Sequence, residues 1–149
     1  MTLIQHDIFA LKDPLKGQLF NHVVTNPPFY ENSKNTRKNV EQKKAYVADF
    51  DLGKWLEYCL KHLRASGSFS MIHRPEMLAQ ILPLLAKKLG NIEIFPLVSQ
   101  KGENANRVLI RGTLNNKGPL TLHFPLIMHT NDGKRTELAE KILRFGKPI

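Results

Sequence analysis

The stretch that decides the fold is His22-Val23-Val24-Thr25-Asn26-Pro27-Pro28-Phe29, a β-branched run that leads directly into an Asn-Pro-Pro-aromatic turn. Consecutive prolines fix the backbone angle φ and remove two N–H donors, so the chain leaves the predicted strand in a stiff, extended shape. The turn presents an amide and an aromatic ring at the end of a buried strand, where open α/β sheets bind their ligands. This predicts a functional site. An ordinary strand exit with a hydrophobic plug is the alternative.

Strands are also predicted elsewhere, from short apolar or β-branched runs between turn residues. The predicted strands are a segment within 2–10 that ends near His6-Asp7, then 20–25, 69–73, 91–98 and 107–114, with an edge strand within 120–128. Pro125 lies in the last of these, and proline in sheets is confined mainly to edges. The polar segment 99–106 is expected to join two adjacent strands.

A first helix is predicted from the spacing of its apolar residues, which places six of them on one face: Leu52, Trp55, Leu56, Cys59, Leu60 and Leu63. Asp49 or Asp51 is expected to cap its start, and Gly67 to supply the left-handed residue beyond its end. We interpret Trp55 as a core residue rather than a base-stacking one.

Two more helices are predicted in the C-terminal half. One runs from about Pro75 to Leu89 and is ended by Gly90, with Pro83 expected to kink or split it. The last runs from about 136 to 145, with a threonine cap and a glycine stop. No internal repeat or linker interrupts residues 1–149, which predicts a single domain.

The composition narrows the class of protein. The 149 residues suit one domain, with a formal net charge of +9 and a pI near 9.8 that favour a polyanionic partner such as nucleic acid. Cys59 is the one cysteine, which excludes an internal disulfide and fits a reducing compartment. With neither a membrane-length apolar run nor a secretory pattern at the N-terminus, the expected location is the cytoplasm.

Basic residues gather directly after the turn. Five of them lie within residues 34–44, where Glu41 is the only acid: Lys34, Arg37, Lys38, Lys43 and Lys44. The segment is polar and has no core periodicity, so it is predicted to be a loop that grips phosphates beside the site, with affinity that falls as salt rises. A merely solvated loop is the alternative. Arg74, at the end of a predicted strand, is a further candidate for phosphate contact.

The Asn-Pro-Pro-Phe turn resembles the motif of class I S-adenosylmethionine-dependent methyltransferases that modify amino nitrogens. The resemblance implies that the Asn26 side chain and the Pro27 carbonyl accept hydrogen bonds from the target amine and favour its pyramidal form, while Phe29 stacks on the base. These roles are positioning and electrostatics, without a covalent intermediate. Pro28 and Tyr30 are assigned with them to the substrate side of the site.

Other stretches extend the resemblance over nearly the whole chain. Residues 63–69 are similar to the family's turn into its fifth strand, with Ser68 in place of a glycine. Residues 72–76 and 102–110 resemble the bacterial tRNA1(Val) (adenine-N6) methyltransferases. This implies S-adenosylmethionine as cofactor, tRNA as partner and N6 of an adenosine as target. The implied fold is α/β, the second half of a Rossmann-like class I methyltransferase sheet with a C-terminal antiparallel hairpin.

The Gly-rich first half of such a domain is absent. There are nine glycines and no Gly-x-Gly, so no loop is present to cradle the cofactor's methionine end. Asp7 matches the acid that contacts the cofactor's adenine amine, and Asn26 would also face the cofactor; a turn or cap role for Asp7 is equally open. The strand at 20–25 would keep an open edge, which is an association hazard. The chain is then a C-terminal fragment, the interpretation we favour, a split enzyme completed by a second chain, or a homodimer.

Several functions compete with adenine-N6 methylation. Asn-Pro-Pro motifs also serve methyltransferases for guanine N2 and for glutamine amides. A different class is a non-catalytic RNA-binding or subunit-interaction module that has kept the substrate face. The six histidines show no metal-ligand spacing, so no metal site is predicted.

Overall fold

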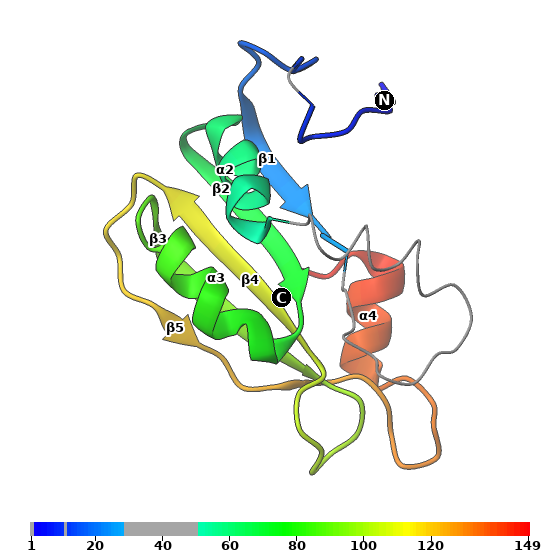
Figure 1. Cartoon of the computed structure of the whole chain (residues 1–149). Helices are drawn as coiled ribbons and strands as arrows, with labels where there is room; N and C mark the ends of the chain where they lie inside the picture. The colour runs from blue at the N-terminus through cyan, green and yellow to red at the C-terminus, as the bar shows by residue number, and fades with distance from the viewer. Residues whose placement is uncertain (1, 11, 29–50) are drawn as a thin grey trace, which may run out of the picture.

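The computed structural model describes residues 2–10, 12–28 and 51–149, in which helices lie on both faces of one sheet (Figure 1). In chain order the elements are β1 (Phe20–Thr25), α2 (Leu52–Lys61), β2 (Leu63–His73), the 3₁₀ helix η1 (Pro75–Met77), α3 (Leu78–Leu85), β3 (Leu89–Val98), β4 (Arg107–Leu114), β5 (Thr121–Leu122), β6 (Leu126–Ile127) and α4 (Glu137–Phe145). The predicted α/β class is confirmed.

Within the described ranges, six strands form the sheet, in the order β1-β2-β4-β3-β5 with β6 also paired to β3. β1 runs parallel to β2, whereas β4 runs antiparallel to both of its neighbours, β2 and β3. The pair β3–β4 is the predicted antiparallel hairpin, with residues 99–106 as its loop. β5 and β6 run parallel to β3 and form the predicted edge.

The main core lies between the sheet and the helices α2 and α3. Phe69 and Met71 of β2 and Ile110 of β4 are 0% exposed, and they pack with apolar residues of both helices. The helices contribute Leu52, Leu56, Leu60, Ile81 and Leu85 to this cluster. The apolar spacing that predicts the first helix therefore also predicts its buried face.

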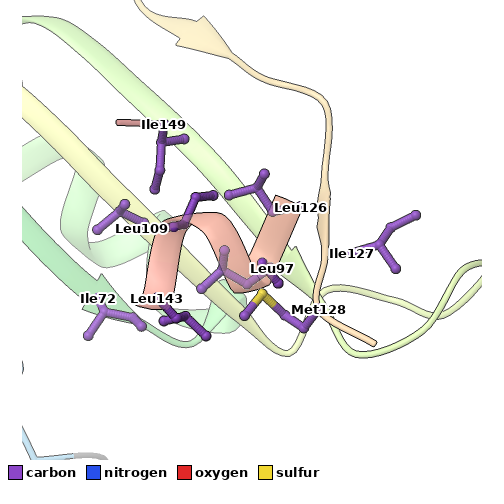
Figure 2. Close-up of a pocket in the computed structure, with 10 residues that line it drawn as sticks. Ile72, Leu97, Leu109, Leu126, Ile127, Met128, Leu143 and Ile149 are labelled. Atoms are coloured by element: carbon purple, nitrogen blue, oxygen red, sulfur yellow. The ribbon is translucent and has the colours of Figure 1, made fainter. Parts of the chain in front are cut away.

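The helix α4 packs on the opposite face. Successive strand residues point to opposite faces, so Ile72 and Leu109 point away from the main core. Figure 2 shows α4 crossing this face, with Leu143 beside Ile72. An apolar cavity of about 120 Å³ lies between α4 and the sheet. No helix in the described ranges is long and apolar enough to cross a membrane.

The predicted caps are largely confirmed. Asp51 is the cap of α2, where its Oδ1 accepts the Lys54 N–H at 3.0 Å. Thr136 caps α4, and Gly146 ends it at φ 62°. Both caps satisfy N–H groups that have no partner within the helix.

Two predictions about the N-terminal half of the chain are wrong. Residues 2–10 contain no strand; 2–7 are exposed, because no neighbouring strand of the described sheet pairs with them. The left-handed residue after α2 is Ser66, at φ 60°, and not Gly67. The helix already ends at Lys61, and Gly67 lies inside β2, where an added Cβ would come within 3.0 Å of the Asn21 carbonyl oxygen.

The second predicted helix is too long and is divided at a different place. It consists of η1 and then α3, which ends at Leu85, so the break lies at residues 77–78 while Pro83 stays inside α3. Gly90 is the second residue of β3, and not a helix stop. An added Cβ at Gly90 would lie 2.2 Å from the Asn116 carbonyl oxygen, so this glycine is required by close packing of the strand against a turn.

Candidate functional site

The turn after β1 lies at the carboxyl end of a parallel strand pair, as predicted. Thr25, the last residue of β1, is opposite Met71 near the end of β2. The Asn26 side chain is exposed, whereas Pro27 is fully buried. The Asn26 amide is therefore exposed, while the buried Pro27 packs the turn against the rest of the protein.

A hydrogen bond that sequence analysis missed ties this turn to α2. The indole N–H of Trp55 donates to Thr25 Oγ1 at 2.9 Å, and Thr25 is 8% exposed. Trp55 is half-buried and is not among the residues of the main core cluster, and its ring lies 6.3 Å from that of Phe9. The alternation of side chains along the strand could have indicated that Thr25 faces inward, because it follows exposed Val24.

Burial raises the pKa of the Cys59 thiol and outweighs the opposite effect of the Thr25 hydroxyl. Cys59 is therefore a neutral thiol at neutral pH and not an activated nucleophile. The Thr25 hydroxyl lies between two side chains of α2. This contact holds the residue before Asn26 in place.

Asp7 lies in a turn on the N-terminal side of α2. Its Oδ1 accepts the Phe9 N–H at 2.9 Å, which is the geometry of the turn role. It lines an open, polar hollow of about 620 Å³ with residues of α2, among them Asp51, Lys54 and Glu57. Asn26 is not among the residues that line this hollow.

A charged cluster around Asp13 links the segment before β1 to the C-terminal end of α2. Asp13 Oδ2 lies 2.8 Å from Lys61 Nζ and 3.1 Å from His62 Nε2, and its Oδ1 accepts the Tyr58 hydroxyl at 3.0 Å. The hydrogen bond from Lys61 is the main cause that holds the pKa of Asp13 far below its usual range. Burial, followed by the hydrogen bond to Asp13, raises the pKa of Tyr58 to about 12. The cluster therefore consists of a carboxylate, an ammonium and a neutral phenol.

The end of β2 carries His73 and Arg74. His73 is 4% exposed, and its Nδ1 accepts the Arg74 backbone N–H at 2.8 Å. Burial, then the charges of Arg74 and Arg107, lower the pKa of His73. The imidazole is therefore neutral at neutral pH, with the proton on Nε2.

Five predicted site residues cannot be placed. Phe29, Tyr30, Lys34, Arg37 and Lys38 all lie outside the described residues. Of the predicted site, the structure describes Asp7, Asn26, Pro27, Pro28 and Arg74. Asn26 and Pro27 share the sheet end with Arg74, whereas Asp7 lies in the hollow beside α2.

The residues present fit only part of a cofactor such as S-adenosylmethionine. Asp7 and Asn26 are exposed polar groups of the kind that contact an adenine amine or a target amine. The sequence offers no glycine pair to cradle the methionine end. Within the described ranges, no group of three His, Cys, Asp or Glu residues is arranged so that it could hold a metal ion.

Comparisons with known proteins find similarity to methyltransferases. No protein-family model matches the chain. Over 111 residues it is 28% identical to the tRNA1(Val) (adenine(37)-N6)-methyltransferase of Shewanella baltica (strain OS195), a match that covers 73% of this chain and 47% of that enzyme. It is also similar to the solved structure of a predicted O-methyltransferase from Agrobacterium tumefaciens, with a TM-score of 0.65 and 25% identity, covering 83% of this chain and 50% of that one.

The fold and these matches make the chain similar to class I methyltransferases. The chain spans about half the length of each of the two proteins. The predicted partial Rossmann-like sheet is confirmed.

Proposed function

We propose that this chain is the substrate-side part of an enzyme that transfers a methyl group from S-adenosylmethionine to N6 of an adenosine in tRNA. The observation that carries the proposal is the Asn26-Pro27 turn at the carboxyl end of β1, in a chain that matches a tRNA adenine-N6 methyltransferase. Ligands of open α/β sheets bind at this end of the strands. The proposed place of action is the cytoplasm.

The proposed chemistry of the turn is to orient a weakly nucleophilic amine. The Asn26 side-chain oxygen and the Pro27 carbonyl would accept hydrogen bonds from its two N–H groups and favour the pyramidal form. Its lone pair would attack the methyl carbon as the C–S bond breaks to leave a neutral thioether, and the methylated nitrogen would then lose one proton to solvent. Preorganised acceptors of this kind lower the barrier because they need little rearrangement during the reaction. The Thr25–Trp55 hydrogen bond supports the preorganisation, since it fixes the residue next to Asn26.

The basic charge supports RNA as the substrate. The net charge of +9 attracts a polyanion, and the target base would be unstacked to reach the turn. We propose that Phe29 stacks on this base beside Pro28 and Tyr30. Lys34, Arg37, Lys38 and Arg74 would then hold the backbone phosphates.

We further propose that activity requires another polypeptide segment on the free side of β1. In the part of the chain that the structure describes, β1 pairs with β2 alone, and Val24 is 80% exposed. Strands of parallel sheets are normally buried on both faces. A second chain or a second copy of this chain would cover the edge, and Asp7 would meet the cofactor's adenine only in the completed site.

The test is complementation with a defined fragment. The 149-residue chain is mixed with a polypeptide that covers the part of the Shewanella baltica enzyme outside the match, and transfer of labelled methyl groups to tRNA is measured. We expect N6-methyladenosine in the digested tRNA. N2-methylguanosine, or a methylated glutamine in a protein substrate, would instead support one of the other amino-nitrogen activities.

The variant Asn26→Ala tests the role of the turn. Loss of one preorganised polar contact typically reduces turnover by about 100-fold or more, so we expect this reduction in the complemented enzyme with tRNA and cofactor affinities within about twofold of the original. The matched control is Asn21→Ala, an exposed asparagine at the other end of β1. Equal turnover of the two variants would contradict the role of Asn26.

Calorimetric titration of the chain alone with S-adenosylmethionine separates the remaining alternatives. Saturable micromolar binding would indicate a cofactor site formed by copies of this chain. Salt-dependent tRNA binding, without cofactor binding before or after complementation, would favour the non-catalytic RNA-binding module.

A further inference from the structure

Two arginines face each other at the sheet end that carries the candidate site. β2 ends at His73 and is followed by Arg74, and β4 begins at Arg107. His73 is opposite Val108 in the antiparallel register of these strands, so the next position sets Arg74 opposite Arg107. Both arginine residues are half-buried.

The Asn26-Pro27 turn comes to the same end of the sheet. Thr25 is opposite Met71, two residues before β2 ends, so the turn leaves β1 level with the last residues of β2. In Figure 1, the arrowheads of β1 and β2 and the start of β4 lie toward the same end of the sheet. The arginine pair therefore lies beside the proposed amine site and not at a distant surface.

The charges of both arginines act on the same buried histidine. Buried His73 lies next to both arginines, and their charges are the second and third causes, after burial, that lower its pKa. The charge of Glu76 acts in the opposite direction and is the weakest of the five causes. The two arginine charges therefore come together beside this buried ring, at the site end of the sheet.

We propose that Arg107, together with Arg74, binds a backbone phosphate of the RNA substrate next to the target nucleotide. The inference rests on the proposed RNA substrate and adds a residue to that site. Arginine is suited to the role because its planar group donates two parallel hydrogen bonds to phosphate oxygens. A phosphate held here would fix the backbone on the far side of β2 from the Asn26-Pro27 turn.

Another arginine of the same strand provides a matched control. Arg111 lies four residues along β4, where its Nε donates to Glu93 Oε2 at 2.9 Å and its guanidinium lies 5.4 Å from the Phe95 ring centroid. Its charge is thus neutralised on the sheet surface. Arg107 and Arg111 share strand, residue type and partial exposure, but only Arg107 lies at the site end.

The experiment measures tRNA binding by the full chain across a series of salt concentrations, for Arg107→Gln, Arg107→Lys and Arg111→Gln. Removing a phosphate contact lowers the slope of log affinity against log salt by about 0.7 to 0.9. We expect that reduction for Arg107→Gln, with affinity at least about tenfold weaker, as for the loss of a charge-assisted hydrogen bond. Arg107→Lys keeps the charge and should keep the slope, and Arg111→Gln should keep both slope and affinity.

An unchanged slope for Arg107→Gln, or equal losses for the Arg107 and Arg111 glutamine variants, would overturn the inference while leaving the proposed methyl transfer intact. If Arg107→Gln unfolds, as circular dichroism would show, the comparison rests on Arg107→Ala and Arg107→Lys, of which only the latter should keep the slope. Absence of any salt-dependent tRNA binding by the unmodified chain would overturn this inference, whereas absence of tRNA methylation by the complemented enzyme would overturn the proposed function. Methylation of tRNA by the complemented enzyme is measured separately, so the two failures can be distinguished.

Discussion

The centre of the sheet and its β1 edge have similarly apolar sequences but opposite environments. In the centre, Phe69 and Met71 are 0% exposed, whereas at the edge Val24 is 80% and Phe20 38% exposed. Residues of β2 and β4 are covered by helices, and β1 has a single described neighbour in the sheet. The difference shows that the described residues form a well-packed core and a β1 edge that no described strand covers, and that the candidate site belongs to that edge.

This contrast explains why the turn depends on contacts outside the sheet. On one side, Asn26 follows a strand that is held by β2 and, through the Thr25–Trp55 hydrogen bond, by α2. On the other side, the backbone of β1 faces no described strand. A strand added on that side would complete the proposed amine site. Substitutions in the centre should therefore mainly lower stability, and substitutions at the edge should mainly impair assembly and function.

The largest effect is expected in the centre. Phe69→Ala should lower the free energy of unfolding by about 3 to 5 kcal/mol, because it leaves a cavity in a closely packed core. This is a large share of the stability of a typical domain. Urea denaturation followed by circular dichroism measures the loss. A cost below about 1 kcal/mol would show that the centre is as loosely packed as the edge.

Much of the fold could be predicted because local patterns and tertiary packing agree. The limits of β1 and β4 and the Thr136 cap of α4 follow directly from β-branched runs and capping chemistry. Predictions failed where long-range packing decides. Gly90 looks like a helix stop in the sequence, but its role is to let β3 approach the turn at Asn116.

The candidate site could be predicted less fully than the fold. A proline pair after a strand marks Asn26 locally, but the Thr25–Trp55 contact joins residues thirty positions apart in the chain. The pairing of Arg74 with Arg107 depends on an antiparallel register that no local motif encodes. The strand predicted near Asp7 is absent because a strand requires a neighbour, and the described sheet supplies none.

An intermediate effect is expected at the junction between the two regions. Thr25→Val removes the acceptor of the Trp55 indole N–H and should cost about 1 to 2 kcal/mol of unfolding free energy, since it leaves a half-buried donor without this partner. Trp55→Phe and the double variant complete a double-mutant cycle, which should give a coupling of about 1 kcal/mol. Additive losses would mean that the hydrogen bond does not hold the turn.

The smallest effect on stability is expected at the edge, where the effect on assembly should be largest. Val24→Lys should change the free energy of unfolding by no more than about 0.5 kcal/mol, because the side chain is already 80% exposed. The same charge should prevent association with the complementing fragment, since it would have to be buried between β1 and the added segment.

Leu122→Lys, at the 67% exposed edge position on β5, is the matched control and should leave association unchanged. Native mass spectrometry of the mixed polypeptides measures the complex. If Val24→Lys and Leu122→Lys assemble equally well, the free side of β1 is not where the enzyme is completed.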